Sequence, residues 1–254
     1  MSEKKFDASS VNMSQFKGVT FTGADDNTNI QDLVQLGQEF DFVEFGILLR
    51  QDDGQGVARY PSEGWLKNLL VAKEKNEFLL DIALHICGPN AIEELVRLGS
   101  QLIHLAKKFD RVQLNMRWQQ HEIREIGKAV DYLVDSDVSV ITQFNDQNVE
   151  LYKYLFFWDA HQVLFDFSGG NGKLPKNWPE PIPGVTCGYA GGLSPDNIAE
   201  EFPKIYAAAM SRKGEDANKK REFWIDMETG VRDEKDQFSI ARCRDVLEYI
   251  NKLY

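Results

Sequence analysis

Eight short runs of apolar and β-branched residues recur along the chain at intervals of roughly 20 to 40 residues, and most are followed by apolar residues at helical spacing. This is the period of a βα unit, because the strands of an all-β sandwich recur about every 8 to 12 residues. The runs therefore predict strands that alternate with helices. The predicted strands are Val19–Phe21, Phe42–Leu49, Phe78–Ile86, Val112–Met116, Val138–Phe144, Val163–Phe167, Val185–Tyr189 and Phe223–Met227.

Eight such strands fit either a closed (β/α)8 barrel or an open doubly wound sheet. An open sheet is expected to carry a glycine-rich dinucleotide fingerprint after its first strand, and no such motif follows Phe21. The chain has 254 residues, and its composition shows no break. That length is close to the roughly 250 residues of a typical barrel. We therefore predict an α/β protein with one (β/α)8 TIM barrel domain over residues 1–254, which includes a short polar extension at residues 1–16.

The helical pattern is regular after most strands and fails after the sixth. Asn90 is expected to cap one helix whose apolar stripe runs to Ala106, and Pro203 is expected to divide the helix after the seventh strand into two short pieces. Between the sixth and seventh strands, Lys173–Gly184 contains four prolines. Because proline removes a backbone donor and fixes φ, this crossover is expected to be extended or irregular. The sixth helix is therefore predicted to be degenerate or missing.

Charge and cysteine content narrow the class of protein. The 29 basic and 40 acidic residues give a formal net charge of −11. Such a surface offers little counter-charge to phosphate groups, which argues against nucleic acids or membranes as partners. Three widely spaced cysteines predict neither a disulfide framework nor a metal site, and no cofactor is predicted. No apolar run approaches the roughly 18 residues of a membrane helix, and the amino terminus lacks a signal-peptide core, so we expect a cytoplasmic protein.

In a barrel of this type the chemistry lies at the carboxyl ends of the strands, and a phosphate site often follows strands seven and eight. The paired glycines Gly191 and Gly192 let a ligand approach the backbone, and Ser194 is expected to cap a helix whose amides bind an anion. Thr229 and Gly230 add a hydroxyl and a second bare turn. Both turns also fit an alternative reading as ordinary barrel connections. The polar residues assigned to the strand ends are Thr20, Thr22, Glu44, His85, Asn115, Gln143, Asp166, Gly191, Gly192, Thr229 and Gly230.

Four segments of the chain match, in the same order, the motifs of one enzyme family. Tyr189–Ile198 (YAGGLSPDNI) is similar to SGGLNPENV, and Phe223–Val231 (FWIDMETGV) runs beside AVDVSSGVE. Leu164–Lys173 (LFDFSGGNGK) is similar to LLD…GGxGK, and Arg59–Glu63 (RYPSE) is similar to RYxSPE. Through these motifs the chain resembles the phosphoribosylanthranilate isomerases, (β/α)8 enzymes of the tryptophan pathway.

The resemblance implies roles for the matching residues. It makes Asp166 the general acid and places Arg59 on a loop that closes over the substrate. The family's reaction is an Amadori rearrangement, which opens a phosphoribosyl ring and moves a proton from C2, so it needs one acid and one base. The residues implied to cradle the phosphate are Gly191, Gly192, Thr229 and Gly230.

The chain departs from the family at the base. Thr22 stands where the family has its catalytic cysteine, and a threonine hydroxyl with no activating partner accepts no proton at neutral pH. Thr22 is therefore assigned to substrate binding. His85 and Glu44 are the two candidate replacement bases, the first as a neutral imidazole at the barrel mouth and the second on the interior register of its strand. Glu228 replaces a serine of the family and would repel a phosphate that it faced.

We therefore expect an isomerase-like enzyme that acts by acid–base chemistry on a phosphorylated sugar or phosphoribosyl compound, with little or no turnover of phosphoribosylanthranilate. The alternative is a pseudoenzyme that binds a phosphorylated ligand and has lost its base, and a third reading is a scaffold for other proteins. Structural readings also exist for Asp166 as a turn cap, Arg59 as a solvated loop residue and His85 as a hydrogen-bonded interior residue. The predicted partner is a phosphorylated small molecule, and the oligomeric state stays open.

Overall fold

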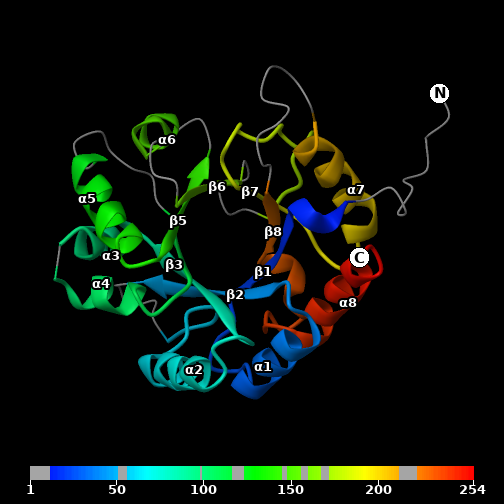
Figure 1. Ribbon diagram of the computed structural model, residues 1–254. Helices are drawn as coiled ribbons and strands as arrows, with labels where there is room; N and C mark the ends of the chain where they lie inside the picture. The colour runs from blue at the N-terminus through cyan, green and yellow to red at the C-terminus, as the bar shows by residue number, and fades with distance from the viewer. Residues whose placement is uncertain are drawn as a thin grey trace.

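The computed structural model describes residues 12–50, 56–97, 99–115, 123–144, 148–155, 160–166, 172–211 and 222–254. Eight parallel strands pair in chain order, and β1 also pairs with β8, so the sheet closes into a barrel. Helices surround the barrel on its outside (Figure 1). The prediction of a (β/α)8 barrel is confirmed. The strands are β1 (Phe16–Thr22), β2 (Val43–Arg50), β3 (Asp81–Cys87), β4 (Arg111–Asn115), β5 (Ser139–Phe144), β6 (His161–Phe165), β7 (Cys187–Ala190) and β8 (Phe223–Met227).

Serine caps fix the starts of several helices. Ser62 Oγ accepts the amide of Trp65 at 3.2 Å, and Ser239 Oγ accepts the amide of Arg242 at 3.3 Å. These bonds satisfy amides that the first turn of a helix leaves without intrahelical partners. The helices are α1 (Ile30–Glu39), α2 (Glu63–Lys75), α3 (Pro89–Leu95), α4 (Gln101–Ala106), α5 (Ile123–Val134), α6 (Val149–Leu155), α7 (Ile198–Ala209) and α8 (Ile240–Asn251), with the 3-10 helices η2 (Met13–Gln15) and η3 (Thr229–Val231).

The prediction of one helix capped by Asn90 after the third strand is wrong. The segment forms two helices, α3 and α4, and α3 begins directly after Gly88. Gly99 has a φ of +84°, in the left-handed region where helices commonly end. Ser100 then caps α4, because its Oγ accepts the Ile103 amide at 3.2 Å. The chain therefore breaks into two helices at Gly99 and Ser100, although the apolar residues continue at helical spacing.

The prediction that Pro203 divides the helix after β7 is also wrong. Helix α7 runs without a break from Ile198 to Ala209 and contains Pro203. Proline has no amide hydrogen to donate to the carbonyl of Ala199, four residues earlier. The hydroxyl of Tyr249 on α8 donates to that carbonyl at 3.4 Å. The neighbouring helix therefore supplies the donor that the proline ring removes.

The crossover between β6 and β7 lacks a helix in its described residues, 172–186, as the proline content predicts. We call residues 172–186 the crossover strap. Trp178 Nε1 donates to Glu201 on α7 at 2.8 Å, and the hydroxyl of Tyr189 on β7 donates to the carbonyl of Pro179 at 3.2 Å. Side chains of neighbouring elements therefore hold the strap against the barrel. In Figure 1 it lies near β6, β7 and α7.

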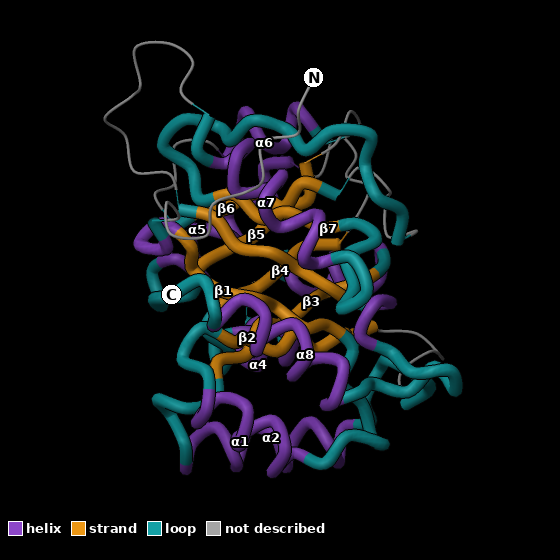
Figure 2. Tube along the Cα trace, turned by 90° about the vertical axis from the view of Figure 1, so that its right-hand side faces the viewer, coloured by secondary structure: helices purple, strands orange, loops and turns teal. Residues whose placement is uncertain are grey.

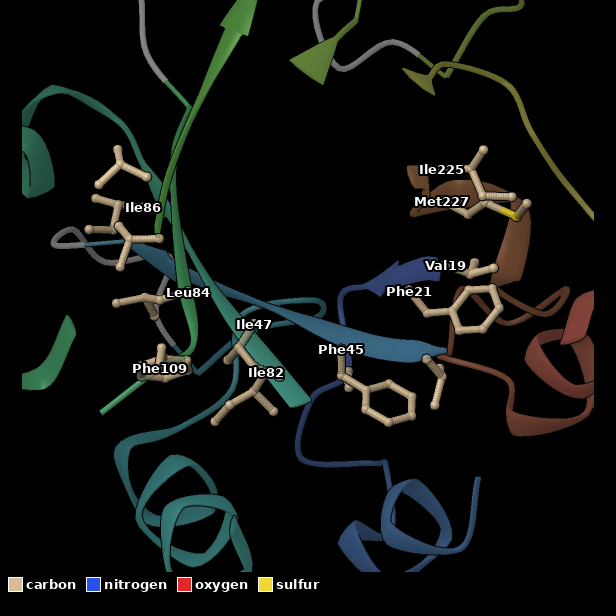
Figure 3. Close-up of a cluster of buried hydrophobic side chains, with 14 of the residues drawn as sticks. Val19, Phe21, Phe45, Ile47, Ile82, Leu84, Ile86, Phe109, Ile225 and Met227 are labelled. Carbon is tan, nitrogen blue, oxygen red and sulfur yellow. The ribbon is translucent and has the colours of Figure 1, made fainter. Parts of the chain in front are cut away.

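The main core lies between the barrel and its helices. Side chains alternate across a strand, so each strand supplies one face to this core and the other to the barrel interior. On β1, Val19 and Phe21 belong to the core and point outward beside Ile225 of β8 (Figure 3). Thr20 and Thr22 on the same strand point inward and are buried.

The barrel interior holds both apolar and polar side chains. Ile141, Leu164 and Trp224 form a small apolar cluster on β5, β6 and β8, separate from the main core. His85 on β3 and Gln113 on β4 are buried polar residues in contact with each other. Buried polar atoms of this kind require hydrogen-bond partners.

The first described residues pack against the outside of the barrel. The amide of Asn12 donates to the hydroxyl of Tyr206 on α7 at 2.8 Å, and Met13 is buried in the core. Residues 1–11 of the predicted polar extension lie outside the described part. Figure 2, a view turned by 90°, shows the strands enclosed between helices. None of the described helices has both the length and the apolar character that crossing a bilayer requires.

Candidate active site

Three chain segments meet at the carboxyl ends of β6, β7 and β8. A Cβ atom placed on Gly230 would lie 1.9 Å from the carbonyl oxygen of Leu193, so the turn after β8 contacts the turn after β7 directly. A Cβ atom on Gly192 would lie 2.6 Å from the amide nitrogen of Leu174, so the turn after β7 is equally close to the crossover strap. Glycine permits such close backbone approach. The structure therefore brings together the glycines that the sequence predicts to cradle a phosphate.

The same turns leave amide groups available. Gly191 and Gly192 both have left-handed backbones, with φ of +113° and +68°. Within the described residues, the amides of Gly192 and Gly230 donate no hydrogen bond. The side chain of Thr229 adds a hydroxyl to this corner, and a Cβ atom on Gly172 would lie 3.7 Å from its Oγ1. We call Gly191, Gly192, Thr229 and Gly230 the glycine turns.

Ser194 is not the N-cap of the helix after β7, and that part of the prediction is wrong. Helix α7 begins at Ile198, and the amide of Ser194 donates to Asn197 Oδ1 at 2.9 Å. Asn197 also donates its side-chain amide to the carbonyl of Gly192 at 2.8 Å. The asparagine side chain therefore bridges Gly192 and Ser194 and holds the turn in place.

Asp166 borders the glycine turns. It directly follows the last residue of β6, is buried, and shares the inward face of its strand with Leu164, two residues earlier. A Cβ atom on Gly191 would lie 3.8 Å from Asp166 Oδ1. This is the neighbourhood that the family resemblance implies for the general acid. Residues 167–171, which complete the motif, lie outside the described part.

Arg59 extends from the loop after β2 to the turn after β8. Its Nη1 donates to Glu228 Oε1 at 2.7 Å and to Thr229 Oγ1 at 3.3 Å, and its Nη2 donates to Asp236 Oδ1 at 2.8 Å. Its φ of +75° is uncommon for a residue other than glycine, and its amide donates to Asp25 Oδ2 at 2.9 Å. Arg59 therefore stands beside the glycine turns with its charge shared between two carboxylates. Residues 51–55 of its loop lie outside the described part.

Glu228 is paired with Arg59, and its side chain is 35% exposed. Its Cγ would lie 3.7 Å from a Cβ atom on Gly23, which follows β1. The guanidinium charge beside it reduces the repulsion that the sequence predicts between Glu228 and a bound phosphate.

Thr22 ends β1 inside the barrel, where its hydroxyl donates to Asp226 Oδ1 at 3.1 Å. Asp226, on β8, is buried, and burial raises its pKa to about 8. The sequence interpretation missed Asp226. A signal existed, because an aspartate inside the apolar strand FWIDM lies on the same face as Trp224, two residues earlier, and that face points into the barrel.

Asp226 and Asp166 lie on the two strands beside β7, and Asp226 lies deeper in the barrel because the strands are tilted. Phe165 pairs with Tyr189, and Asp226 pairs with Ala190, so the two carboxyl groups flank Ala190 on the intervening strand. Neighbouring strands are about 4.8 Å apart, which places the two Cα atoms about 10 Å from each other. Two inward carboxyl groups on either side of one small side chain form an arrangement suited to paired proton transfers.

His85 is inside the barrel and not at an exposed mouth position. It is 1% exposed, and burial lowers its pKa to about 4. Its Nδ1 lies 3.4 Å from Gln113 Nε2. A neutral imidazole with this pKa is a weak base, so its assignment as the replacement base has no support in this environment.

Glu44 lies at the opposite end of the barrel from the predicted site, and its assignment to a carboxyl end is wrong. It is the second residue of β2, and Arg111 donates to its two carboxylate oxygens at 2.6 and 2.7 Å. Thr20 Oγ1 donates to the same carboxylate at 2.8 Å. Burial alone would raise the pKa of Glu44, but the charge and hydrogen bonds of Arg111 outweigh it, and the pKa lies below its ordinary value. The sequence register gives the face of a strand but not the depth along the barrel.

The three cysteines are free thiols, and Cys87 is the one at the mouth. Asn115 Nδ2 donates to its Sγ at 3.5 Å, and burial raises the pKa of Cys87 to about 11. A thiol that stays protonated at neutral pH does not replace the family's cysteine base. Among the described residues, no group of three or more histidine, cysteine, aspartate or glutamate side chains is placed to hold a metal ion.

A closed parallel barrel with polar groups gathered at the carboxyl ends of its strands defines a (β/α)8 barrel with a candidate ligand site at its mouth. No protein-family model matches the sequence, and no curated protein matches it.

Solved structures show what the fold is similar to. A phosphoribosyl anthranilate isomerase from Thermus thermophilus has a TM-score of 0.58 at 18% identity, over 93% of this chain and 100% of that one. TrpF from Jonesia denitrificans has a TM-score of 0.58 at 14% identity, over 93% of this chain and 97% of that one. A phospho-2-dehydro-3-deoxyheptonate aldolase from Thermotoga maritima has a TM-score of 0.54 at 12% identity, over 94% of this chain and 70% of that one. The chain therefore shares the barrel fold of these enzymes.

Proposed function

We propose that this protein is an isomerase-like enzyme that acts by acid–base chemistry on a phosphorylated sugar or phosphoribosyl compound. The observation that carries the proposal is the position of Asp166 beside the glycine turns, with a second buried carboxyl group, Asp226, on the other side of Ala190. The motif resemblance to phosphoribosylanthranilate isomerases at these residues supports it.

The glycine turns suit a phosphate group. Gly192, Thr229 and Gly230 lie on two turns that contact each other, and their amides and hydroxyl are donors of the kind that bind phosphate oxygens. Arg59 adds a guanidinium group 3.3 Å from Thr229 Oγ1. A phosphate must compete with Glu228 for this guanidinium, which favours a ligand with two negative charges over a singly charged one.

The two aspartates divide the proton transfers. Asp166, the general acid by resemblance, protonates the ring oxygen of the sugar so that the ring opens. Asp226 takes the proton from C2, and its raised pKa makes its carboxylate a stronger base than an ordinary aspartate. One proton enters the substrate and one leaves it, which is the balance of an isomerisation.

Phosphoribosylanthranilate is not the proposed substrate. Thr22 stands where the phosphoribosylanthranilate isomerases have their catalytic cysteine, and its hydroxyl donates a hydrogen bond to Asp226. A base on β8 approaches a substrate from a different direction than a base at the end of β1 does. We therefore expect very poor turnover of phosphoribosylanthranilate, which a direct assay of the purified protein checks.

The proposal is tested by following deuterium incorporation at C2 of ribose 5-phosphate and other phosphorylated aldoses in D₂O by NMR. We expect Asp166→Asn to lose about 100-fold or more of the exchange rate, because it removes a general acid. The same variant should keep the rise in melting temperature that the ligand causes. Asp135→Asn, an exposed aspartate beyond α5, is the matched control and should change neither measurement. Undiminished exchange in Asp166→Asn would contradict the assignment.

A ligand-binding pseudoenzyme is the second candidate. One observation favours it, because a pKa of about 8 leaves Asp226 mostly protonated at neutral pH. In that case phosphorylated ligands raise the melting temperature, but no exchange occurs at any pH up to 9. If millimolar phosphorylated ligands leave the melting temperature unchanged, both candidates fail and the scaffold reading gains support.

A further inference from the structure

A group of buried side chains inside the barrel is not used by the proton transfers proposed above. Thr22 on β1 and His85 on β3 both lie over Gly46 on the strand between them. A Cβ atom placed on Gly46 would lie 2.3 Å from Thr22 Oγ1 and 2.9 Å from His85 Nε2. The separation of these two atoms cannot exceed the sum of those distances, about 5.2 Å. The missing side chain at Gly46 allows this approach.

The contact with Gln113 favours the form of His85 that carries its ring hydrogen on Nε2. The amide nitrogen of Gln113 is only a donor, so His85 Nδ1, at 3.4 Å, is the acceptor of that contact. The orientation of the Gln113 amide follows from its 2.8 Å bond to Asn115 Oδ1. Burial keeps the ring neutral, since the pKa of His85 is about 4. The Nε2–H group has no hydrogen-bond partner among the described residues.

Two other buried atoms in the polar interior also lack partners in the described part of the chain, namely Asp226 Oδ2 and Gln113 Oε1. Buried polar atoms are nearly always hydrogen-bonded, to protein or to water. A polar contact longer than about 3.5 Å is commonly bridged by a water, and buried waters make two to four hydrogen bonds. The separation of Thr22 Oγ1 and His85 Nε2, at most about 5.2 Å, and the missing partner of Nε2 among the described residues suit such a bridge.

We propose that one buried water joins His85 Nε2 to Thr22 Oγ1, and that His85, this water and Thr22 form a hydrogen-bond relay that positions the proton of Asp226. His85 donates to the water, the water donates to Thr22 Oγ1, and the Thr22 hydroxyl donates to Asp226 Oδ1 at 3.1 Å. A hydroxyl that accepts a hydrogen bond becomes a stronger donor. The relay therefore stabilises the carboxylate form of Asp226 and leaves Oδ2 as the oxygen that binds and releases a proton.

Charged groups near the relay change the pKa values of Asp226 and His85 without taking part in the relay's hydrogen bonds. Glu228 and Glu44 raise the pKa of Asp226, and Arg111 lowers it. Glu44 raises the pKa of His85, and Arg111 lowers it. Among the described residues, Thr22 is the hydrogen-bond donor to Asp226. His85 is thus a neutral positioning residue that acts on Asp226 through Thr22.

NMR of the full chain without substrate tests the relay. In protein labelled with ¹⁵N-histidine and ¹³C-aspartate, we expect the His85 hydrogen on Nε2 and magnetisation transfer to it from a long-lived water. We expect His85→Leu to raise the pKa of Asp226 by about one unit, because the carboxylate loses a polarised donor. Thr22→Val should raise it by at least as much. Adding His85→Leu to Thr22→Val should cause no further change, because the relay is already broken.

His161→Leu is the matched control. His161 is also a buried histidine with a pKa lowered to about 4, but its Nε2 contacts Thr142 Oγ1 at 2.8 Å and its ring faces Tyr152 of α6. This variant should leave the pKa of Asp226 unchanged. Equal effects of His85→Leu and His161→Leu, or a hydrogen on Nδ1 of His85, would overturn the proposal. If His85→Leu does not fold, the near-isosteric Thr22→Val decides the result.

The part that the relay plays in turnover rests on the proposed function, but the relay itself is measured without substrate. If no phosphorylated aldose exchanges deuterium while the pKa of Asp226 responds to His85, the proposed function fails and the relay stands. If exchange occurs while His85→Leu leaves the pKa of Asp226 unchanged, the relay fails and the proposed function stands.

Discussion

Two carboxylates, the largely buried Glu44 and the buried Asp226, lie inside the same barrel but hold protons in opposite ways. Near the amino end, Glu44 receives two hydrogen bonds from Arg111 and one from Thr20, and its pKa lies below its ordinary value. Near the carboxyl end, the described residues give Asp226 one hydrogen bond, from Thr22, and burial raises its pKa to about 8. Burial is common to both groups, so the number and charge of the donors decide the protonation state.

This difference distinguishes a more fully paired end of the barrel, which we call the structural end, from a less fully paired one. At the amino end, Arg111 also donates to Gln162 at 2.7 Å and lies 4.5 Å from the centre of the Trp224 ring. Toward the carboxyl end, buried polar atoms of His85 and Asp226 lack partners within the described residues. In barrels of this class the amino end serves stability and the carboxyl end serves catalysis. Full pairing stabilises a fold, whereas incomplete pairing leaves groups that exchange protons or bind ligands.

Removing Arg111 should change the free energy of unfolding most, because it leaves the carboxylate at the amino end without most of its hydrogen-bond donors, as Asp226 is at the carboxyl end. Arg111→Met leaves Glu44 as a buried charge without its partner, and we expect a loss of about 3 to 5 kcal/mol in the free energy of unfolding. Urea denaturation at pH 7 measures this loss.

Two variants make that measurement specific. Lys153→Met breaks an exposed ion pair with Glu150 and should cost less than about 1 kcal/mol. Arg111→Met combined with Glu44→Leu removes both charges and should restore most of the stability. If Arg111→Met cost no more than Lys153→Met, the amino end would not be the structural end.

Asp226 should make stability depend on pH in the sense opposite to Glu44. A folded-state pKa of about 8 lies above the ordinary value of 3.8, so between these values the folded chain binds the proton that the unfolded chain releases. Stability contributed by protonated Asp226 is therefore lost as the pH rises through this window, by about 3 kcal/mol between pH 5 and pH 7.

Asp226→Asn should remove this dependence, so its stability relative to the parent chain should increase as the pH rises. Asp135→Asn provides the control and should leave the pH dependence unchanged. Unfolding by urea at several pH values measures both, and identical pH profiles for the parent chain and Asp226→Asn would refute the raised pKa.

A smaller effect should distinguish the glycine turns from an ordinary glycine. Gly230→Ala places a Cβ atom 1.9 Å from the carbonyl oxygen of Leu193, which must move, and we expect a loss of about 1 to 3 kcal/mol. Gly64→Ala in α2 meets only Ser62 Oγ at 3.8 Å, and alanine favours a helix by about 0.5 to 1 kcal/mol. Thermal unfolding should therefore show opposite signs for the two alanines. A gain in stability for both would mean that the turns after β7 and β8 are not in close contact.

The fold was predictable because its signals are local and repeated. Each strand is a short apolar run such as Phe223–Met227, and the observed strand has those bounds. The missing helix after β6 follows from prolines that exclude one. The errors at Asn90 and Pro203 arose where a glycine–serine pair or a contact from a neighbouring helix outweighed the local pattern.

The site was predictable only in part. Motif resemblance located Asp166 and the glycine turns, which the structure brings together at one edge of the barrel. The candidate bases were misplaced, because alternation along a strand reports which face a residue occupies but not how deep it lies. Glu44 is six residues before the end of β2, and Asp226 was overlooked inside a strand that otherwise reads as apolar.

The crossover strap makes part of the barrel wall sensitive to substitutions in neighbouring elements. A helix satisfies its backbone within its own segment, whereas an extended segment depends on groups that other elements offer. The strap depends on Glu201 of α7 and Tyr189 of β7. A substitution that removes Glu201 from α7 therefore also removes a support of the strap.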